Sequence, residues 1–350
     1  MTASADLRVT LQRRYDAVIA DVLAQRAPVA LIGFPNHSNP GDSAIWVGQL
    51  AALRRGGHRI AYVCDWLSYD EQHLRRRAPD ATILMHGGGN LGDIWPEHQR
   101  LRERIVAAFP DRRIVQLPQT LYFSDPRNLE RARRVFDAHP DLTLLLRDQR
   151  SLVQSQDAFA SRSLVCPDSA FALGPLPRLG EPDTDVVWLA RTDAEAASDQ
   201  AGGPPDAADV RVIDWLSEAP GDPGWNGAEA RRRLATRGGG RVVAGLPALV
   251  DPLAPALWQL YDRHAELRVQ YGRRLLSGGR GLVTNRLHGH ILALLMDIPH
   301  VVLDNSYGKN RTFYDTWTWE WPRARWSSSP ASALDELRAL PDQEAARRAR

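Results

Sequence analysis

Short, continuous apolar runs alternate with amphipathic stretches along most of this chain, and this alternation limits the folds open to it. An apolar run of strand length without polar alternation must be buried on both faces of a sheet. Amphipathic stretches of helical spacing between such runs supply the layers that cover those faces. The sequence therefore predicts an α/β protein with parallel sheets. The expected strands are 28–34, 59–64, 81–86, 112–117, 142–147, 186–190, 210–213, 281–284 and 300–304.

A change in composition divides this series in two. Residues 174–185 are rich in Pro, Gly and charge, which is typical of a linker between domains. Two consecutive α/β domains would leave a cleft between them, where ligands usually bind. The expected helices are 7–25, 43–55, 70–76, 96–108, 126–138, 148–157, 254–277 and 287–296. The predicted boundaries are 1–175 for an N-terminal lobe, 176–185 for the linker, 186–330 for a C-terminal lobe and 331–350 for a polar C-terminal helix.

The charged residues and cysteines exclude several classes of protein. The 44 basic and 42 acidic residues leave a formal net charge of +2, whereas a nucleic-acid-binding domain would show a clear basic excess. Residues 1–26 lack the apolar segment of a signal peptide, and no run approaches the roughly 18 apolar residues of a membrane span. Cys64 and Cys166 each end an apolar run and are expected to pack as small hydrophobic residues. We expect a cytoplasmic protein, with the inner face of the membrane as an alternative location.

The segment HGGGNLGD (residues 86–93) follows an expected strand and allows three interpretations. Its glycines fit the G-x-G-x-x-G pattern of dinucleotide sites, but no helix opens on them and Asp111 precedes the next strand instead of ending it. HGGG also occurs in esterase oxyanion holes, yet the chain has no G-x-S-x-G nucleophile elbow. The remaining interpretation is a glycine-rich turn at the carboxyl end of a parallel strand, where open α/β sheets bind ligands.

A second loop, residues 36–42, also follows a strand and ends in Gly-Asp. Both loops should lie on one rim of the sheet, because parallel strands share the edge at which they end. Each Gly-Asp could instead be a tight turn whose aspartate caps the next helix. The candidate substrate-binding residues in the two loops are Asn39, Asp42, Gly88, Gly89, Asn90 and Asp93.

The strongest indication of a site is TNRLHGH (residues 284–290), which follows an expected strand and opens an expected helix. A helix N-terminus attracts anions through its unpaired N–H groups and its dipole. Arg286 adds a fork suited to a carboxylate or phosphate, and His288 can exchange a proton near neutral pH. Alternatively, His288 caps the helix and Arg286 pairs with an acidic surface residue. His290, two residues on, should point to a different face of the helix.

Two further segments should reach the same rim as Arg286. Arg191 ends the first strand of the second lobe, although an arginine in that position alone could be a structural ion pair. Residues 304–310 follow the strand 300–304 and supply Asn305, Tyr307 and Lys309 as candidate substrate-binding residues. Lys309 is the single lysine among the 44 basic residues. A compact ammonium and a guanidinium fork are not interchangeable at an anion site, so we expect this lysine to have a specific role.

The sequence offers no metal site. Asp183 and Asp185 form a D-x-D pair like that of metal-dependent glycosyltransferases, but they precede a strand instead of following one and are expected to be a solvated turn. Walker A and HExxH motifs are missing. We therefore expect neither a metal nor another cofactor.

Seven segments, taken together and in this order, resemble the polysaccharide pyruvyl transferase family. They are NPGDSAI (39–45), HGGGNLGDIW (86–95), PQT (118–120), RDQRS (147–151), CPDSAF (166–171), RLHGHILALLMDIPHV (286–301) and DNSYGKNRTFYDTW (304–317). The resemblance implies a GT-B-like fold of two Rossmann-like lobes. It also implies transfer of the enolpyruvyl unit of phosphoenolpyruvate to a sugar, with formation of a pyruvate ketal. Residues 195–250 match poorly, so the choice of acceptor could differ there.

The resemblance also implies roles for individual residues. Arg286 and His288 match the catalytic Arg-x-His of the family, and Arg191 matches an arginine that opens the second lobe. We expect Lys309 to help the two arginines hold the donor's anionic groups, and Asp42 or Asp93 to orient the acceptor hydroxyls or take their protons. The expected partners are phosphoenolpyruvate as donor and a free or lipid-linked glycan as acceptor, with peripheral contact to a membrane in the lipid-linked case.

Two other functions stay open on sequence alone. A GT-B glycosyltransferase would place the diphosphate of a nucleotide sugar in the same cleft. A non-catalytic glycan-binding protein would use the aromatic residues near the loops and would not need His288.

Overall fold

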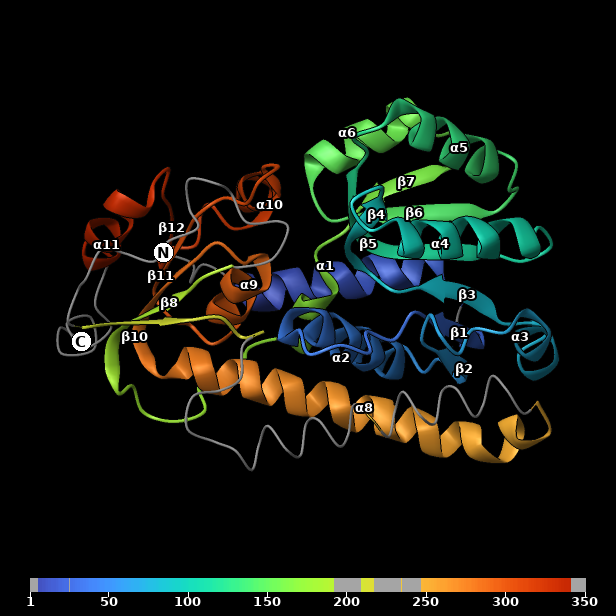
Figure 1. Ribbon diagram of the computed structural model, residues 1–350, viewed down its shortest axis with the longest axis horizontal. Coiled ribbons are helices and arrows are strands. Elements are labelled where there is room, and N and C mark those ends of the chain that lie inside the picture. The colour runs from blue at the N-terminus through green and yellow to red at the C-terminus, as the bar shows by residue number, and fades with distance from the viewer. Residues whose placement is uncertain (1–5, 25, 192–208, 217–233, 235–246, 341–350) are drawn as a thin grey trace.

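The computed structural model of this chain describes residues 6–24, 26–191, 209–216, 234 and 247–340. It contains two parallel β-sheets with helices packed on them, which confirms the predicted α/β class (Figure 1). The strand order is β2-β1-β3-β5-β6-β7 in the first sheet, where β4 also pairs with β5, and β12-β11-β10-β8-β9 in the second. All pairings between these strands are parallel. No described helix combines the length and the apolarity needed to cross a membrane.

The strands are β1 (Val29–Ile32), β2 (Ile60–Cys64), β3 (Thr82–Met85), β4 (Gly88–Gly92), β5 (Ile114–Tyr122), β6 (Leu142–Leu146), β7 (Arg162–Val165), β8 (Thr184–Leu189), β9 (Val210–Ile213), β10 (Gly279–Thr284), β11 (His300–Val302) and β12 (Ala324–Trp326). The helices are α1 (Leu7–Val22), α2 (Pro40–Arg55), α3 (Glu71–Arg77), α4 (Pro96–Ala108), α5 (Pro126–Asp137), α6 (Gln149–Ala158), the 3₁₀ helix η1 (Ser169–Leu173), α8 (Pro247–Ser277), α9 (Leu287–Leu295), α10 (Lys309–Trp317) and α11 (Pro330–Arg338).

The first sheet is buried on both faces, as its continuous apolar strands require. Val29 and Leu31 of β1 pack with α1, α2 and α8 on one face. Ala30 and Ile32 face the opposite layer, which contains α3, α4 and α5. Successive residues of a strand point to opposite faces, so a strand covered on both sides must be apolar throughout.

The second sheet is covered in the same way. Leu282 of β10 packs against α9, whose residues from Leu287 to Leu295 are all buried. The next residue, Val283, faces α11 on the other side of the sheet. Helix α9 therefore lies between the second sheet and the first lobe, which fixes the position of its N-terminus.

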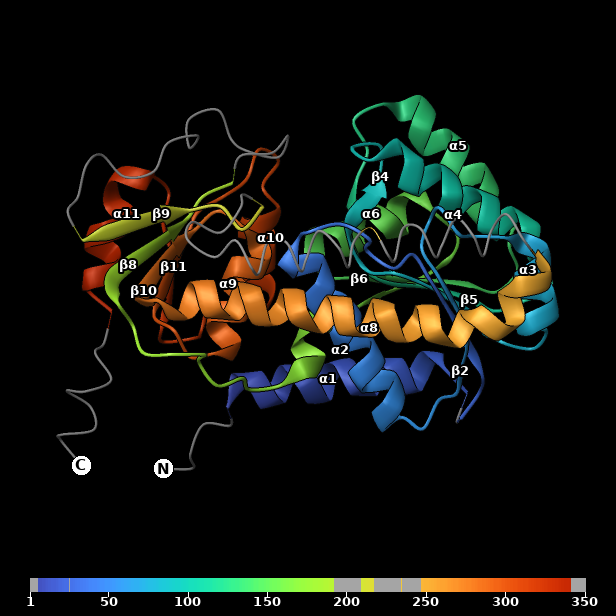
Figure 2. The ribbon, with the colours of Figure 1, turned by 60° about the horizontal axis from the view of Figure 1, so that its bottom comes forward.

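The two lobes share a core instead of meeting only at a linker. Ala44 of α2 and Phe171 of η1 lie in the same apolar cluster as Val187 of β8 and Ile291 of α9. Helix α8 runs along both lobes beside α2 (Figure 2). These shared helices set the spacing of the lobes and hence the geometry of the space between them.

Several elements differ from the sequence-based expectation. The glycine-rich segment is not a turn, because Gly88–Gly92 form β4 beside β5. Its glycines permit this close pairing, since a Cβ atom at Gly92 would collide with the carbonyl group of Tyr122. Helix α2 begins at Pro40, inside the expected loop, because Asn39 caps it and a proline is well tolerated in the first turn. Strands β7 and β12 and helix α10 were not predicted, and residues 341–350 of the expected C-terminal helix lie outside the described residues.

A chain of buried hydrogen bonds holds α9 in place. The carbonyl group of Ile298 can only accept, so Nδ1 of His300 donates to it at 2.7 Å. Nε2 of His300 is then an acceptor for Nδ1 of His290 at 2.7 Å, and Nε2 of His290 faces the hydroxyl of Thr318 at 2.9 Å. Both rings are neutral, because burial lowers the pKa of each. His290 points into the second lobe, away from the side of α9 that carries His288.

These histidines predict that the protein loses stability as the pH falls from 7 to 5. Burial lowers the pKa of His300 to about 4 and that of His290 well below its usual value. Between about pH 6.5 and pH 4 the unfolded chain binds protons that the folded one does not, so stability rises with pH across this range. For His300 the loss at pH 5 is roughly 2 kcal/mol. Denaturant unfolding at pH 5, 6 and 7 measures this loss. The free energy of unfolding of His300→Gln should depend less steeply on pH. An unchanged slope in the variant would show that His300 does not contribute.

Candidate active site

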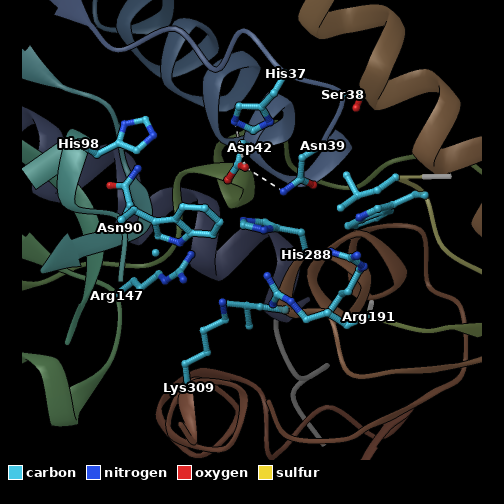
Figure 3. A pocket seen from close by; sticks show the side chains of 16 residues that line it. His37, Ser38, Asn39, Asp42, Asn90, His98, Arg147, Arg191, His288 and Lys309 are labelled. Atoms are coloured by element: carbon cyan, nitrogen blue, oxygen red, sulfur yellow. Dashed lines mark hydrogen bonds and ion pairs between the residues drawn. The ribbon is translucent and has the colours of Figure 1, made fainter. Parts of the chain in front are cut away.

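A cavity of about 410 Å³, here called the interlobe pocket, opens between the lobes near the carboxyl ends of strands from both sheets (Figure 3). Its volume lies within the roughly 300–1,000 Å³ typical of small-molecule sites. The first lobe contributes His37, Ser38, Asn39, Asp42, Gly89, Asn90, Trp95, His98 and Arg147, and the second contributes Arg191, Trp215, Leu216, Arg286, Leu287, His288 and Lys309. The structure thus brings together Arg191, Arg286, His288 and Lys309, as the sequence predicts.

Arg286 is held rigidly at the start of α9. Its Nη2 atom donates to both carboxylate oxygens of Asp214, at 2.7 and 2.9 Å, and its Nε donates to the carbonyl group of Ala190 at 3.2 Å. The sequence left open that Arg286 pairs with an acidic residue on the surface. Arg286 does form an ion pair, but the side chain of its partner Asp214 is only 8% exposed. The guanidinium still lines the pocket, so Asp214 fixes its orientation there.

Lys309 is the first residue of α10 and is almost fully buried. Gly308 precedes it with φ of 83°, a left-handed conformation that favours glycine. The side-chain oxygen of Asn305 accepts from the Lys309 backbone N–H at 2.9 Å, and the Nζ atom lies 5.3 Å from the centre of the Tyr307 ring. Asn305 and Tyr307 thus position Lys309, and neither lines the pocket.

His288 lies near the middle of the pocket, between the Asp42 side and Lys309 (Figure 3). Its ring packs so closely on the backbone of Gly41 that a Cβ atom there would lie 2.7 Å from it. Its Nε2 atom lies 3.4 Å from Oδ2 of Asp168, a fully buried carboxylate of the first lobe. His288 is therefore positioned by both lobes.

Asp168 joins His288 to Arg147. Nη1 of Arg147 donates to Oδ2 of Asp168 at 2.9 Å, and the backbone N–H of Ala170 donates to Oδ1 at 2.9 Å. Burial raises the pKa of the Asp168 carboxyl, but His288, Arg147 and this N–H lower it more, so the pKa lies well below its usual value. Asp168 is therefore a carboxylate at any physiological pH.

Sequence reasoning gave no role to Arg147 or Asp168, although both lie in segments that carry the family resemblance. The signal that could have found Arg147 is its place directly after β6, since the same rule of strand ends selected Arg191. Asp168 is harder to find, because its role depends on contacts with residues far away in the chain.

The opposite side of the pocket is polar and aromatic. Asn39 caps α2 and donates from Nδ2 to Oδ2 of Asp42 at 2.8 Å. Burial raises the pKa of Asp42, but His37, His288, His86 and Lys309 lower it more. Gly89 and Asn90 line this side, as the sequence predicts. Trp95, 37% exposed, and His98 also line it and were not predicted as site residues.

Asp93 and Gly88 do not line the pocket. The carboxylate of Asp93 accepts from the backbone N–H groups of Ser124 and Asp125, both at 2.8 Å, and so fixes the loop after β5. Burial raises the pKa of Asp93, but these hydrogen bonds lower it by more, so the pKa lies below its usual value. Gly88 begins β4 with φ of 133°. The structure therefore leaves Asp42 as the pocket aspartate of the two proposed from sequence.

The described residues contain no cluster of three His, Cys, Asp or Glu side chains that could hold a metal ion. Asp183 and Asp185 of the D-x-D pair are largely exposed and pair with Arg211 and Arg280. Both side chains are solvated, as expected, but Asp185 lies in β8 and so is not part of a turn before the strand.

The chain resembles pyruvyl transferases over most of its length. A model of the family described as "Polysaccharide pyruvyl transferase" matches residues 39–307. Pyruvyl transferase 1 of Schizosaccharomyces pombe is 32% identical over 336 residues, which span 91% of this chain and 74% of that protein. The Bacillus subtilis protein EpsO, which carries a provisional pyruvyl transferase name, is 30% identical over 88% of this chain and 91% of its own.

One solved structure shares the fold. A functionally uncharacterised protein of Klebsiella pneumoniae matches with a TM-score of 0.58 and 14% identity, over 91% of this chain and 99% of that one. At this identity the likeness concerns the arrangement of the lobes alone.

The buried pair of Arg147 and Asp168 predicts a large stability change. Asp168→Asn should lower the free energy of unfolding by about 3–5 kcal/mol, because the buried guanidinium loses its countercharge. Denaturant unfolding measures the change. Arg147→Met combined with Asp168→Asn should recover part of the loss, and Asp141→Asn, in an exposed pair with Arg113, should cost less than about 1 kcal/mol. A cost for Asp168→Asn no larger than that of this control would contradict the assignment.

Proposed function

Because this chain belongs to the polysaccharide pyruvyl transferase family, we propose that it transfers pyruvate from phosphoenolpyruvate to a sugar of a polysaccharide or lipid-linked oligosaccharide. The products are a pyruvate ketal and phosphate. The observation that carries the proposal is the convergence of Arg191, Arg286, His288 and Lys309 in one pocket that also has a polar and aromatic side. The proposal needs no resident cofactor, because proton transfers and anion binding suffice for this reaction.

The cationic side of the pocket suits the proposed donor. Phosphoenolpyruvate carries a carboxylate and a phosphate, and charge-assisted hydrogen bonds from buried cations bind such groups strongly. Three helices, α2, α9 and α10, also begin beside the pocket, so their N-terminal dipoles add to the positive potential. The same cations would stabilise the negative charge that develops on the leaving phosphate.

His288 is the group that can protonate the donor. As an imidazolium it gives a proton to the methylene carbon, which becomes a methyl group while a sugar oxygen bonds to the adjacent carbon. The bond from that carbon to the phosphate oxygen then breaks with its electron pair on oxygen, and a second sugar hydroxyl closes the ketal. The two hydroxyls lose two protons in all. One balances the proton in the new methyl group, and the other leaves with the phosphate.

The acceptor would occupy the opposite side. Trp95 offers an exposed aromatic face, and Asp42, Asn39 and Asn90 offer carboxylate and amide groups for sugar hydroxyls. The spatial separation of cations from this polar side matches a reaction between an anionic donor and a neutral acceptor.

His288→Gln is expected to lower kcat at least ~100-fold, because the proton donor is lost. The stability cost should be smaller than that of Asp168→Asn, because Arg147 still pairs with the Asp168 carboxylate. Phosphate release from phosphoenolpyruvate with an oligosaccharide acceptor measures turnover, and thermal melting monitors folding. Near wild-type turnover in the variant would exclude His288 as the proton donor.

The wild-type protein itself tests the proposal. Phosphoenolpyruvate should raise its melting temperature, because a ligand that binds only the folded state stabilises it by mass action. Intact phosphoenolpyruvate across a broad acceptor panel, together with no thermal stabilisation, would refute the function. Stabilisation by UDP-sugars instead would support the glycosyltransferase alternative, which the names of the relatives do not favour.

Lys309→Arg is expected to raise the KM for phosphoenolpyruvate about tenfold or more. Lys309 is almost fully buried, and its ammonium group lies beside the backbone of Gly89. A guanidinium is larger and less strongly hydrated than an ammonium, so it should fit this place less well. Arg311→Lys, the reverse exchange at an exposed position two residues on, is the matched control and should change nothing. Steady-state kinetics with varied donor measures both variants. Unchanged kinetics in Lys309→Arg would mean that the single lysine has no specific role.

A further inference from the structure

We infer that His37, held by Asp42, takes the proton from the acceptor hydroxyl that attacks the donor. This inference rests on the proposed function and names a residue that neither the family resemblance nor the sequence analysis assigns. It follows from the position of His37 in the interlobe pocket, from its partner and from the electrostatics of its neighbours.

The backbone around His37 is fixed by buried contacts. Nδ2 of Asn36 donates to the carboxylate of Asp65 at 3.0 Å, and Nη1 of Arg268 donates to the carbonyl group of Pro35 at 2.9 Å. Asp65 and Arg268 are themselves buried. The loop between β1 and α2 is therefore tied to the end of β2 and to α8 just before the histidine, and Asn39 caps α2 just after it, which gives the ring a defined place in the pocket.

His37 and Asp42 form a dyad on the polar side of the pocket (Figure 3). Nε2 of His37 lies 3.5 Å from Oδ2 of Asp42, and that oxygen also accepts from Asn39 at 2.8 Å. An N–H at Nε2 directed to the carboxylate leaves Nδ1 with the lone pair that can accept a proton. The His37 side chain is 46% exposed, so a sugar can reach it, and Asp42 stabilises the imidazolium that forms.

Asp42 itself is poorly suited to accept the proton. Burial raises the pKa of Asp42, but the neighbouring histidines and Lys309 lower it more. The pKa of Asp42 therefore lies below its usual value. A carboxylate of low pKa is a weak base, whereas the ordinary pKa of a histidine side chain lies close enough to neutral pH for it to take a proton from a hydroxyl. Asp42 therefore acts through His37 as a positioning residue.

His86 and His98 also interact electrostatically with His37. Burial lowers the pKa of His86 to about 3 and that of His98 to about 4. Both are thus neutral near pH 7, and Asp42 supplies the charge that His37 senses. Asp42 also favours the protonated form of His86 and His98, but burial outweighs this effect in both, whereas the His37 side chain is 46% exposed.

The pocket then contains two histidine–aspartate dyads with opposite tasks. His288 with Asp168 gives a proton to the methylene carbon, and His37 with Asp42 removes one from the attacking hydroxyl as its oxygen bonds to the adjacent carbon. One proton enters and one leaves in the addition step, and the phosphate later departs with the electron pair of its bond. Because the histidine that gives a proton and the histidine that takes one lie on different sides of the pocket, both can act in the same step.

His37→Gln tests the assignment in the full-length protein. The kcat should fall at least ~100-fold, the typical contribution of a general base. Binding of phosphoenolpyruvate, measured by thermal shift, should stay within threefold because the cationic side is intact. The rise of kcat with pH that reports deprotonation of the base should disappear. His58→Gln, which alters a histidine that lines neither this pocket nor the smaller cavity beside it, should leave all three properties unchanged.

A second variant keeps the test independent of folding. In His37→Gly, added imidazole should restore part of the lost kcat, because the exposed position lets it enter. Loss of less than threefold in kcat for His37→Gln, or no rescue of a folded His37→Gly, would overturn the role of His37. Either result with an active wild-type enzyme leaves the proposed function standing, whereas an inactive wild type across all acceptors refutes the function itself.

Discussion

The interlobe pocket depends on one carboxylate, that of Asp168, which lies between Arg147 and His288. A fully buried carboxylate is costly unless it is paired and hydrogen-bonded, so the fold must bring both partners to it. Arg147 comes from the first lobe and His288 from the second. The same charge therefore stabilises the first lobe, holds the second lobe against it and fixes the histidine around which the chemistry is arranged.

The rest of the fold supports this contact. Helices α1, α2 and α8 pack against both lobes, and α9 lies between them, so the pocket has a rigid frame. The hydrogen-bond chain through His290 and His300 fixes α9 from behind, which places Arg286 and His288 on the pocket side. Three helix N-termini meet at the same place. The proposed anion binding thus rests on the architecture as well as on the individual cationic side chains.

Much of this could be predicted from sequence, for physical reasons. Continuous apolar runs identified the parallel strands, and residues that directly follow them, such as Arg286, had to lie at one edge of a sheet. Strand β4 could not be predicted, because its sequence GGNLG has no apolar pattern and its conformation comes from pairing with β5. Asp168 could not be predicted because its role arises from contacts across the fold, whereas His37 lies in a loop that the sequence did select and only the structure shows that it faces Asp42. Asp93 and Asp42 both follow a glycine in similar loops, so the sequence does not distinguish them. The structure does, because the carboxylate of Asp93 accepts hydrogen bonds from Ser124 and Asp125 outside the pocket.

The central claim is that His288, held by Asp168, protonates the donor while a sugar attacks it in this pocket. The most direct measurement is nuclear magnetic resonance of the glycan product formed from phosphoenolpyruvate in deuterium oxide. Protonation of the methylene carbon by an exchangeable group of the enzyme predicts a ketal whose methyl group carries one deuterium, with one phosphate released per pyruvyl group. A product that keeps the methylene group, or a methyl group without deuterium, would contradict the claim.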